Sequence, residues 1–336
     1  MTRIVTRMLF ILGVSTLSSS LLAELTGSSD LSKYHPPEAP GYASRGEVVV
    51  AIGLKQVALI QQPKSLPAGV REIADVTYGI GGGLPLMLDL YLPPDKNKRP
   101  VPGLIFIHGG AWAGGTRDVY KFYTVDYAAK GYVAATVTYR LSGQAPFPAA
   151  VEDVKCAVRW MRANADQYGI DPHRIAVIGG SAGGHLAMMI GYSSGEISLE
   201  GDGGHEGVSS AVQAVVNFYG VYDMATEEGK QSSAVQRFLD GKSFDEAPNL
   251  YRKSSPRTYL DSSDPPTLII HGVLDQTVDI EQADMLAKDL KRLKVPYLFD
   301  RLEGWPHALD IAVPANNRSR YLMDQFLKEH LSSGKQ

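Results

Sequence analysis

The segment VIGGSAGGHL, residues 177–186, places a single hydroxyl, that of Ser181, between two pairs of glycines. Glycine loses more conformational entropy on folding than other residues, so such a cluster indicates positive φ or very close packing. An apolar run typical of a buried strand precedes the serine, and a helical pattern follows it. Gly-x-Ser-x-Gly at this junction predicts a nucleophile elbow, which exposes the hydroxyl at the carboxyl edge of a sheet. A phosphate-binding turn is the alternative, although no lysine follows as in a Walker loop.

A nucleophilic serine needs a base, and the base needs a third group to orient it. In elbows of this kind the chain order is serine, acid, histidine, which sets aside the histidines that precede Ser181. The predicted base is His307, in the irregular segment LEGWPHALD just after the last predicted strand. Loops at the carboxyl edge of a sheet are where such sites are built. His330, the other late histidine, lies among charged residues of the final helix and is expected to face solvent.

The predicted acid is Asp275, which follows the apolar run TLIIHGV by two residues. Its carboxylate would hold the ring of His307 in the required tautomer and stabilise the imidazolium that forms on serine deprotonation. Asp279 is a nearby competitor, but its position before IEQADML favours a helix cap. Asp223, in the segment FYGVYD after the preceding strand, is a second competitor.

A fourth requirement is a set of donors for the oxygen that becomes negatively charged in the transition state. The segment FIHGGAW, residues 106–112, follows a buried strand, and its glycines let backbone N–H groups approach a substrate oxygen. The amide of Ala182, directly after the nucleophile, is expected to complete the hole. His108 is expected to hold the shape of this loop, and Trp112 either faces the cleft or packs against the loop.

The elements that must position these residues are regular. Buried strands are predicted over residues 87–93, 103–110, 132–140, 174–180, 211–220, 267–273 and 297–304. Amphipathic helices are predicted over residues 148–169, with Pro148 in the first turn, and over 281–293 and 319–331. Strands that alternate with helices predict a mostly parallel sheet with helices on both faces. Upstream, EVVVAI (47–52) and QVALIQQ (56–62) are interpreted as short strands.

The composition fits one large α/β domain, because 44% of the 336 residues are hydrophobic and 21% are charged. The net charge of −3 predicts no strongly basic face, so nucleic acid is not an expected partner. The expected organisation is a signal peptide over residues 1–23, an N-terminal segment over 24–74 that packs on or leads into the core, and a catalytic domain over 75–336.

The signal peptide is inferred from two arginines, the apolar run MLFILGVSTL and the small residue Ala23 at a plausible cleavage point. The protein is therefore expected to be secreted or periplasmic. The apolar run is too short to span a bilayer and no cysteine lies directly after it, so no stable membrane anchor is expected. The only cysteine, Cys156, excludes an intramolecular disulfide.

No metal or organic cofactor is expected, because the chemistry above needs none. The loop EGDGGHEG, Glu200–Gly207, carries acids and a histidine that could bind a cation. A mobile surface loop is the favoured interpretation of this composition.

Several segments resemble the α/β-hydrolases of the hormone-sensitive-lipase and carboxylesterase group: HGGAW, YRLS, GGSAGGHLA, PPTLIIHGVLD and the histidine of GWPH. Longer segments, such as the one from FPAAVEDVKC to GGSAGGHLA, are most similar to the bacterial acetylxylan esterase and feruloyl esterase branch. The resemblance covers roughly residues 75–331 and implies an α/β-hydrolase fold with an eight-stranded, mostly parallel sheet. It implies the following site: a triad of Ser181, Asp275 and His307, and an oxyanion hole from the backbone of Gly109, Gly110 and Ala182.

Two departures from the family pattern affect the expected pocket. Gly180 stands where many relatives have His or Asp, and the oxyanion segment is one glycine shorter than the lipase form. Three aromatic residues, Trp112, Tyr219 and Trp305, are candidates for stacking on a sugar or a phenolic ring. Polar loops over residues 201–210 and 226–236 argue against a trough for long acyl chains.

The expected function is a secreted serine esterase that hydrolyses short-chain acyl or feruloyl esters on plant polysaccharide or its fragments. An arylformamidase-like amidase or a small peptidase is an alternative, because the same triad cleaves amides. A hydrolase-fold binding module without activity is a second alternative from a different class. An intact serine, acid and histidine in the required order argues against it.

Overall fold

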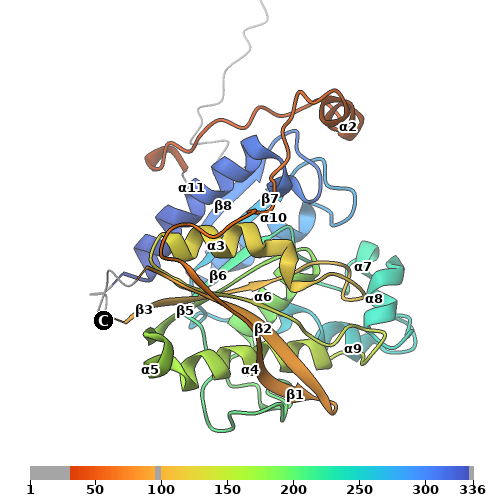
Figure 1. Cartoon of the computed structure of the whole chain (residues 1–336). Coiled ribbons are helices and arrows are strands. Elements are labelled where there is room, and N and C mark those ends of the chain that lie inside the picture. Colours follow the sequence, from red (N-terminus) through yellow and green to blue (C-terminus); the bar gives the residue numbers. More distant parts are fainter. Residues whose placement is uncertain (1–30, 95–99, 333–336) are drawn as a thin grey trace, which may run out of the picture.

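The computed structural model describes residues 31–94 and 100–332 (Figure 1). The signal peptide expected over residues 1–23 and the first residues of the segment 24–74 lie outside the described residues. One sheet organises the described chain, and its strands are β1 (Arg71–Gly81), β2 (Leu84–Leu92), β3 (Val101–Ile107), β4 (Val133–Val137), β5 (Ile170–Gly180), β6 (Ala214–Phe218), β7 (Thr267–Gly272) and β8 (Tyr297–Leu302). Their order across the sheet is β1-β2-β4-β3-β5-β6-β7-β8.

The sheet is antiparallel only at one edge, where β2 pairs with β1 and with β4. From β4 to β8 every pair is parallel. The carboxyl ends of β3, β5, β6, β7 and β8 therefore meet at one edge, because parallel strands point the same way. The loops that follow these strands carry Ser181, Asp275 and His307.

The helices connect the strands. The α-helices are α2 (Arg45–Gly53), α3 (Lys121–Ala129), α4 (Ala149–Ala163), α5 (Ala165–Tyr168), α6 (Ala182–Tyr192), α7 (Glu227–Gln231), α8 (Ser233–Phe238), α9 (Pro248–Lys253), α10 (Glu281–Leu293) and α11 (Val313–His330). The 3-10 helices are η1 (Leu31–Lys33), η2 (Arg117–Tyr120), η3 (Ile197–Leu199), η4 (Pro256–Thr258) and η5 (Leu309–Ile311). Within the described chain, no helix combines the length and apolar character needed to cross a membrane.

Helices cover both faces of the sheet, as the alternating pattern predicts (Figure 1). Strand β3 shows why: Ile105 and Ile107 pack into one apolar cluster, which includes side chains of α4, α6 and α10. Leu104 and Phe106 point the other way, into a second cluster with side chains of α3 and α11. A continuous apolar run is thus buried on both sides.

The seven strands predicted over residues 87–304 are present as β2 to β8, and the helix predicted over 281–293 is α10. The helix predicted over 148–169 is divided into α4 and α5, and Pro148 is the residue before the first turn of α4. Strand β1 was not predicted. Its pairing with β2 has register shifts at Ile73/Val76 and Thr77/Gly79, which break the alternation of apolar residues. The expected boundary at residue 75 falls within β1.

The two short strands expected upstream are not formed. EVVVAI lies in α2, because Ser44 accepts a hydrogen bond from the amide of Glu47, and the carboxylate of Glu47 accepts one from the amide of Ala43. This capping box starts a helix despite the β-branched residues that follow. QVALIQQ contributes only an isolated bridge between Leu59 and Ala312.

The stretch before α2 packs on the loop after β8. The indole Nε1 of Trp305 donates to the carbonyl of Ala39 at 3.0 Å, and the amide of Tyr42 donates to the carbonyl of Gly304 at 3.1 Å. The ring of Tyr42 meets that of Trp305 edge to face, with centroids 5.8 Å apart. The loop that carries His307 is therefore supported by chain that precedes the sheet.

Candidate active site

Ser181 lies in a sharp turn between β5 and α6, with φ 58° and ψ −122°. The glycines around it are explained by close packing. A side chain at Gly179 would overlap the carbonyl of Gly183, and one at Gly183 would overlap the carbonyl of Ile107 on β3. The turn therefore has the geometry of a nucleophile elbow, in which strain at the serine is held by its surroundings.

Gly180, at which the sequence departs from the family pattern described above, faces two tyrosines. The hydroxyls of Tyr120 and Tyr219 occupy the space that a side chain at this position would need. The absence of a side chain at Gly180 therefore makes room for Tyr120 of η2 and for Tyr219, which follows β6.

The structure brings Ser181, His307 and Asp275 together. Nε2 of His307 lies 3.0 Å from Oγ of Ser181, and Nδ1 of His307 lies 2.6 Å from Oδ2 of Asp275. The three residues come from the loops after β5, β8 and β7. Because Asp275 accepts from Nδ1, the neutral ring presents an unprotonated Nε2 to the serine hydroxyl, which is the tautomer that general-base catalysis requires.

Asp275 is held as a buried carboxylate. Its Oδ1 accepts hydrogen bonds from the amides of Thr277 at 2.8 Å and Val278 at 2.9 Å. Burial raises the pKa of Asp275, but hydrogen bonds from His271 and His307 outweigh that effect and hold the pKa well below its usual range. The carboxyl therefore stays ionised beside the ring of His307.

His271 is a site residue that the sequence reasoning missed. It lies at the end of β7, fully buried, with Nε2 2.9 Å from the carbonyl of Val278 and 3.2 Å from Oδ2 of Asp275. Both partners accept hydrogen bonds, so Nε2 carries a proton. The signal was present as a histidine four residues before Asp275 in HGVLD, but the rule of chain order considers only histidines after the acid.

The competing residues have other partners. Oδ1 of Asp279 accepts from the amide of Glu281 in the first turn of α10, as expected of a cap. Asp223 forms an ion pair with Arg257 at 3.0 Å. His330, near the end of α11, is half-buried rather than fully solvated, and its ring lies 4.7 Å from that of Phe326.

The segment expected to supply oxyanion donors lies against the elbow. A Cβ built at Gly109 would lie 3.2 Å from Cβ of Ser181, and Gly110 has φ +116°. Within the described chain, the amides of Gly109, Gly110 and Ala182 donate to no carbonyl or side chain, so all three are available to a ligand. These backbone groups lie on two loops that pack against each other beside the serine.

His108 shapes the loop, as expected from the sequence. Its Nδ1 donates to the carbonyl of Gly109 at 2.8 Å, and its ring stacks on Tyr139 with centroids 4.4 Å apart. The hydroxyl of Tyr139 donates to the carbonyl of His108 at 3.0 Å. Burial lowers the pKa of His108, which favours a neutral ring.

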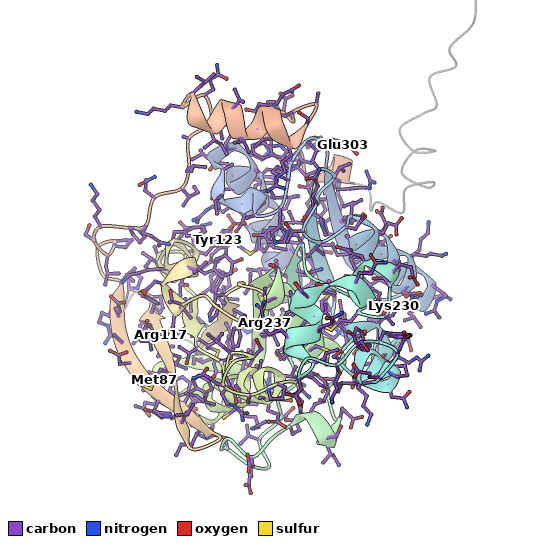
Figure 2. The ribbon with its side chains drawn as sticks, turned by 90° about the vertical axis from the view of Figure 1, so that its right-hand side faces the viewer. Met87, Arg117, Tyr123, Lys230, Arg237 and Glu303 are labelled. Atoms are coloured by element: carbon purple, nitrogen blue, oxygen red, sulfur yellow. The ribbon has the colours of Figure 1, made fainter. Side chains whose placement is uncertain are left out.

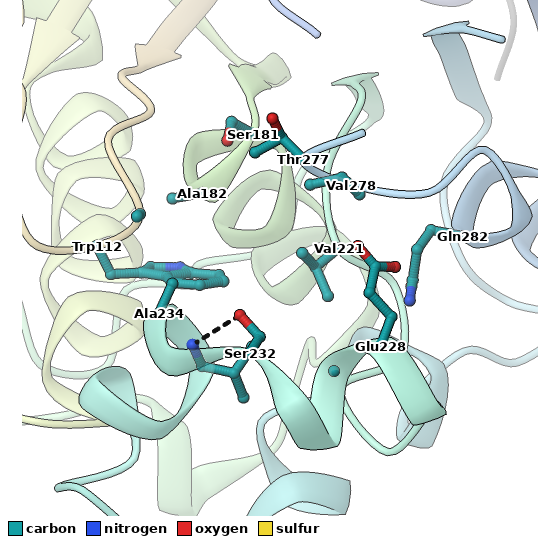
Figure 3. Close-up of a pocket in the computed structure, with 13 residues that line it drawn as sticks. Trp112, Ser181, Ala182, Val221, Glu228, Ser232, Ala234, Thr277, Val278 and Gln282 are labelled. Carbon is teal, nitrogen blue, oxygen red and sulfur yellow. Dashed lines mark hydrogen bonds between the residues drawn. The ribbon is translucent and has the colours of Figure 1, made fainter. Parts of the chain in front are cut away.

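A cavity of about 60 Å³ opens beside Ser181 (Figure 3). Its apolar lining includes Trp112, Val221 and Val235, and its polar lining includes Glu228, Ser232 and Gln282. None of these residues except Trp112 was predicted from the sequence. Lys230 of α7 and Arg237 of α8, both labelled in Figure 2, belong to the same segment after β6. Neither residue lines the cavity.

Only one of the three predicted pocket aromatics lines this cavity. Trp112 is buried, stacks on Phe238 with centroids 4.7 Å apart, and donates from Nε1 to His185 at 3.1 Å. The interpretation of the other two needs correction. Trp305 is 1% exposed and supports the loop of His307 from behind. Tyr219 is buried, its ring lying 4.6 Å from that of His307, and its hydroxyl donates to Asp310.

The carboxylate of Glu200, at the start of the loop Glu200–Gly207, is already engaged by cations. It lies 2.8 Å from both Lys155 and Arg159 and accepts a hydrogen bond from Ser210. Across residues 31–94 and 100–332, no group of three or more His, Cys, Asp or Glu side chains is arranged to hold a metal ion.

Comparison with known proteins supports the fold class and the family. The BD-FAE family model matches residues 88–290, a range that contains Ser181 and Asp275 and ends before His307. Esterase LipC of Mycobacterium tuberculosis is 33% identical over 264 residues, which cover 72% of this chain and 64% of LipC. Esterase LipQ of the same organism is 32% identical over 253 residues, covering 74% of this chain and 59% of LipQ. The chain thus matches about three fifths of the length of these relatives.

Two solved structures show the same architecture. A truncated carbohydrate esterase from gut microbiota superposes with a TM-score of 0.70 at 27% identity, covering 79% of this chain and 99% of its own. The apo form of Thermogutta terrifontis esterase 2 superposes with a TM-score of 0.67 at 26% identity, covering 82% of this chain and all of its own. These similarities confirm the α/β-hydrolase fold and the carboxylesterase group that the sequence resemblance implies.

Proposed function

The chain belongs to the BD-FAE family, and on this premise we propose that it is a serine carboxylesterase that cleaves esters of short acyl groups through an acyl-enzyme on Ser181. The observation that carries the proposal is the hydrogen-bonded series from Asp275 through His307 to Ser181, with distances of 2.6 Å and 3.0 Å. A nucleophile, a base in the required tautomer and an ionised orienting group are thereby in place before substrate binds.

In the first half-reaction, Oγ of Ser181 attacks the ester carbonyl carbon while Nε2 of His307 takes the hydroxyl proton. The carbonyl oxygen becomes negatively charged and accepts hydrogen bonds from the backbone amides of the oxyanion hole, those of Gly109, Gly110 and Ala182. The imidazolium of His307, stabilised by Asp275, then gives its proton to the departing alcohol oxygen as the bond from carbon to oxygen breaks. One oxyanion donor is typically worth about 3 kcal/mol in the transition state.

In the second half-reaction, water replaces the alcohol. His307 takes a proton from the water as it attacks the acyl carbon, and it returns that proton to Oγ of Ser181 as the acid leaves. The same donors stabilise the second oxyanion. Every step uses residues of the chain and water alone.

The size of the cavity beside Ser181 supports a short acyl group. About 60 Å³ corresponds to space for roughly four water molecules, which suits an acyl group of a few carbons. A long acyl chain would need an extended apolar groove, at about 0.8 kcal/mol per buried CH₂. The cavity also favours acetyl over feruloyl as the acyl group.

For the alcohol part we propose a carbohydrate or a small aromatic alcohol, outside the cell or in the periplasm. The similarity to a carbohydrate esterase supports a carbohydrate. The leader pattern of residues 1–23 supports export.

The test compares wild type with Ser181→Ala on p-nitrophenyl esters from acetate to decanoate. Acetate to butyrate should give the highest kcat/KM, and Ser181→Ala should lower kcat by roughly 10⁶. Retention of activity in a clean preparation of Ser181→Ala would disprove the acyl-enzyme on this residue. A steady rise in kcat/KM up to decanoate would disprove the short cavity. Acetylated xylan, methyl ferulate and p-nitroacetanilide then distinguish carbohydrate esterase, feruloyl esterase and amidase.

A further inference from the structure

The cavity beside Ser181 is on the acyl side of the reacting bond. The departing alcohol must receive its proton from His307, so the alcohol part of the substrate lies toward that ring. The cavity is lined by Ala111 and Ala182 from the oxyanion side, and His307 is not among its lining residues. The group held in this cavity is therefore the one that stays on Ser181 in the acyl-enzyme.

The charge that lines this cavity is negative. Glu228 is the only charged residue in the lining, and Figure 3 shows its carboxylate directed from α7 to the space between Val278 and Gln282. Each of its oxygens lies 3.3 Å from the amide of Asp279, whose side chain adds a second negative charge nearby.

The cations of the same region are directed elsewhere. Lys230, on the same helix, pairs with Glu227 at 2.7 Å, and its ammonium lies 4.5 Å from the ring centre of Phe244. Arg257 pairs with Asp223 and Asp289. Partial desolvation and the charges of Asp279 and Asp275 raise the pKa of Glu228, although the amide of Asp279 stabilises its ionised form.

We propose that Glu228 makes the cavity selective for uncharged short acyl groups and excludes acyl groups that end in a carboxylate, such as the hemiesters of succinate. This inference rests on the proposed esterase function and specifies its substrate class. An acyl chain of four carbons that ends in a carboxylate would bring a second negative charge close to Glu228 in a partly enclosed space. Glu228 lines the cavity on one side and is exposed to solvent on the other. Two like charges in this position repel each other, and water on the exposed side of Glu228 screens part of that repulsion. Exclusion of a substrate by repulsion is a common source of specificity.

The experiment measures kcat/KM in a pH-stat at pH 8 for ethyl butyrate and monoethyl succinate. The two substrates share the leaving group and a four-carbon acyl chain, and they differ in one terminal carboxylate. Wild type should prefer ethyl butyrate by at least tenfold. Glu228→Gln keeps an oxygen that can accept from the amide of Asp279 and removes the charge. It should shrink the preference by about tenfold.

The matched control is Glu227→Gln, which removes the same charge from the neighbouring position of α7, outside the cavity. Its preference should equal that of wild type. Circular dichroism verifies that both variants are folded, and each preference is a ratio within one protein, so differences in active fraction cancel.

Three results would overturn the inference while leaving the proposed function intact. The first two are a preference in Glu228→Gln equal to that of wild type, and an equal change in Glu227→Gln. Wild type that hydrolyses ethyl butyrate and monoethyl succinate equally well would also overturn it, because no exclusion then exists. If folded wild type hydrolyses neither ester, the proposed function fails and the inference fails with it.

Discussion

Replacement of Asp275 by Asn tests the proposed mechanism most directly, because the structure fixes how the new amide must lie. Oδ1 of Asp275 accepts from the amides of Thr277 and Val278 at 2.8 and 2.9 Å. An Asn side chain that keeps both bonds places its oxygen at the position of Oδ1. Its NH₂ group then takes the position of Oδ2, which lies 2.6 Å from Nδ1 of His307 in wild type. The opposite orientation leaves two backbone amides without an acceptor, at a cost of about 1–3 kcal/mol each.

The amide nitrogen donates, so Nδ1 of His307 has to accept. The ring proton then moves to Nε2, which faces Oγ of Ser181 at 3.0 Å. A protonated Nε2 cannot take the serine proton, and the variant has a folded site with the wrong tautomer. A loss of about 10⁴ in kcat is expected, equivalent to about 5.5 kcal/mol of transition-state stabilisation.

The assay measures kcat on p-nitrophenyl acetate for wild type, Asp275→Asn and the control Asp279→Asn, with folding checked by circular dichroism. Asp279 caps α10 and does not contact His307, so its variant should stay within about threefold of wild type. An Asp275→Asn variant that keeps more than a tenth of wild-type kcat would show that the carboxylate does not set the tautomer.

The same substitution has a consequence for stability. The pKa of Asp275 is lowered in the folded protein, so the carboxylate contributes stability that is present above the unfolded pKa of about 3.9. That contribution is lost as the pH falls toward the folded pKa. Asp275→Asn should therefore lower the free energy of unfolding at pH 7, and the deficit should narrow in more acidic solution.

Four further variants test the assignment of the base and the charge and packing of the fold. His307→Ala should abolish activity nearly as fully as loss of the serine, whereas His330→Ala should keep kcat within about threefold; equal losses on p-nitrophenyl acetate would mean that the base is misassigned. Asp264→Asn should stabilise the protein at pH 8 but not at pH 4, because burial raises the pKa of this carboxyl from 3.8 to about 7. The gain in the free energy of unfolding at pH 8 has an upper limit of about 4 kcal/mol, and the partial exposure of Asp264 lowers the expected gain to about 1–2 kcal/mol. Urea unfolding that shows no gain at pH 8 would contradict the argument. Gly183→Ala should lower the free energy of unfolding by about 3 kcal/mol, because its methyl would overlap the carbonyl of Ile107; urea unfolding equal to wild type would contradict that packing.

Sequence alone was sufficient for the elements and residues whose signal is local. The strands before Ser181, Asp275 and the loop of His307 are continuous apolar runs, and a parallel sheet necessarily brings their carboxyl ends to one edge. The order of serine, acid and histidine then selected three residues that the structure places within hydrogen-bond distance. Local patterns predicted the upstream structure less well: the β-branched segment after Ser44 was expected to form a strand, but the hydrogen bonds at Ser44 start a helix there.

Tertiary structure decided what depends on contacts between distant segments. Trp305 and Tyr219 have the composition of ligand-binding residues, but chain from Ala39 and the side chain of Asp310 bury them behind His307. Glu228 lies in a polar surface helix by sequence, and only the packing of α7 beside the elbow turns its carboxylate to the acyl cavity. The physical reason is that a run of apolar residues reports burial within one segment, whereas the direction of a side chain into a shared cavity depends on how several loops pack against one another.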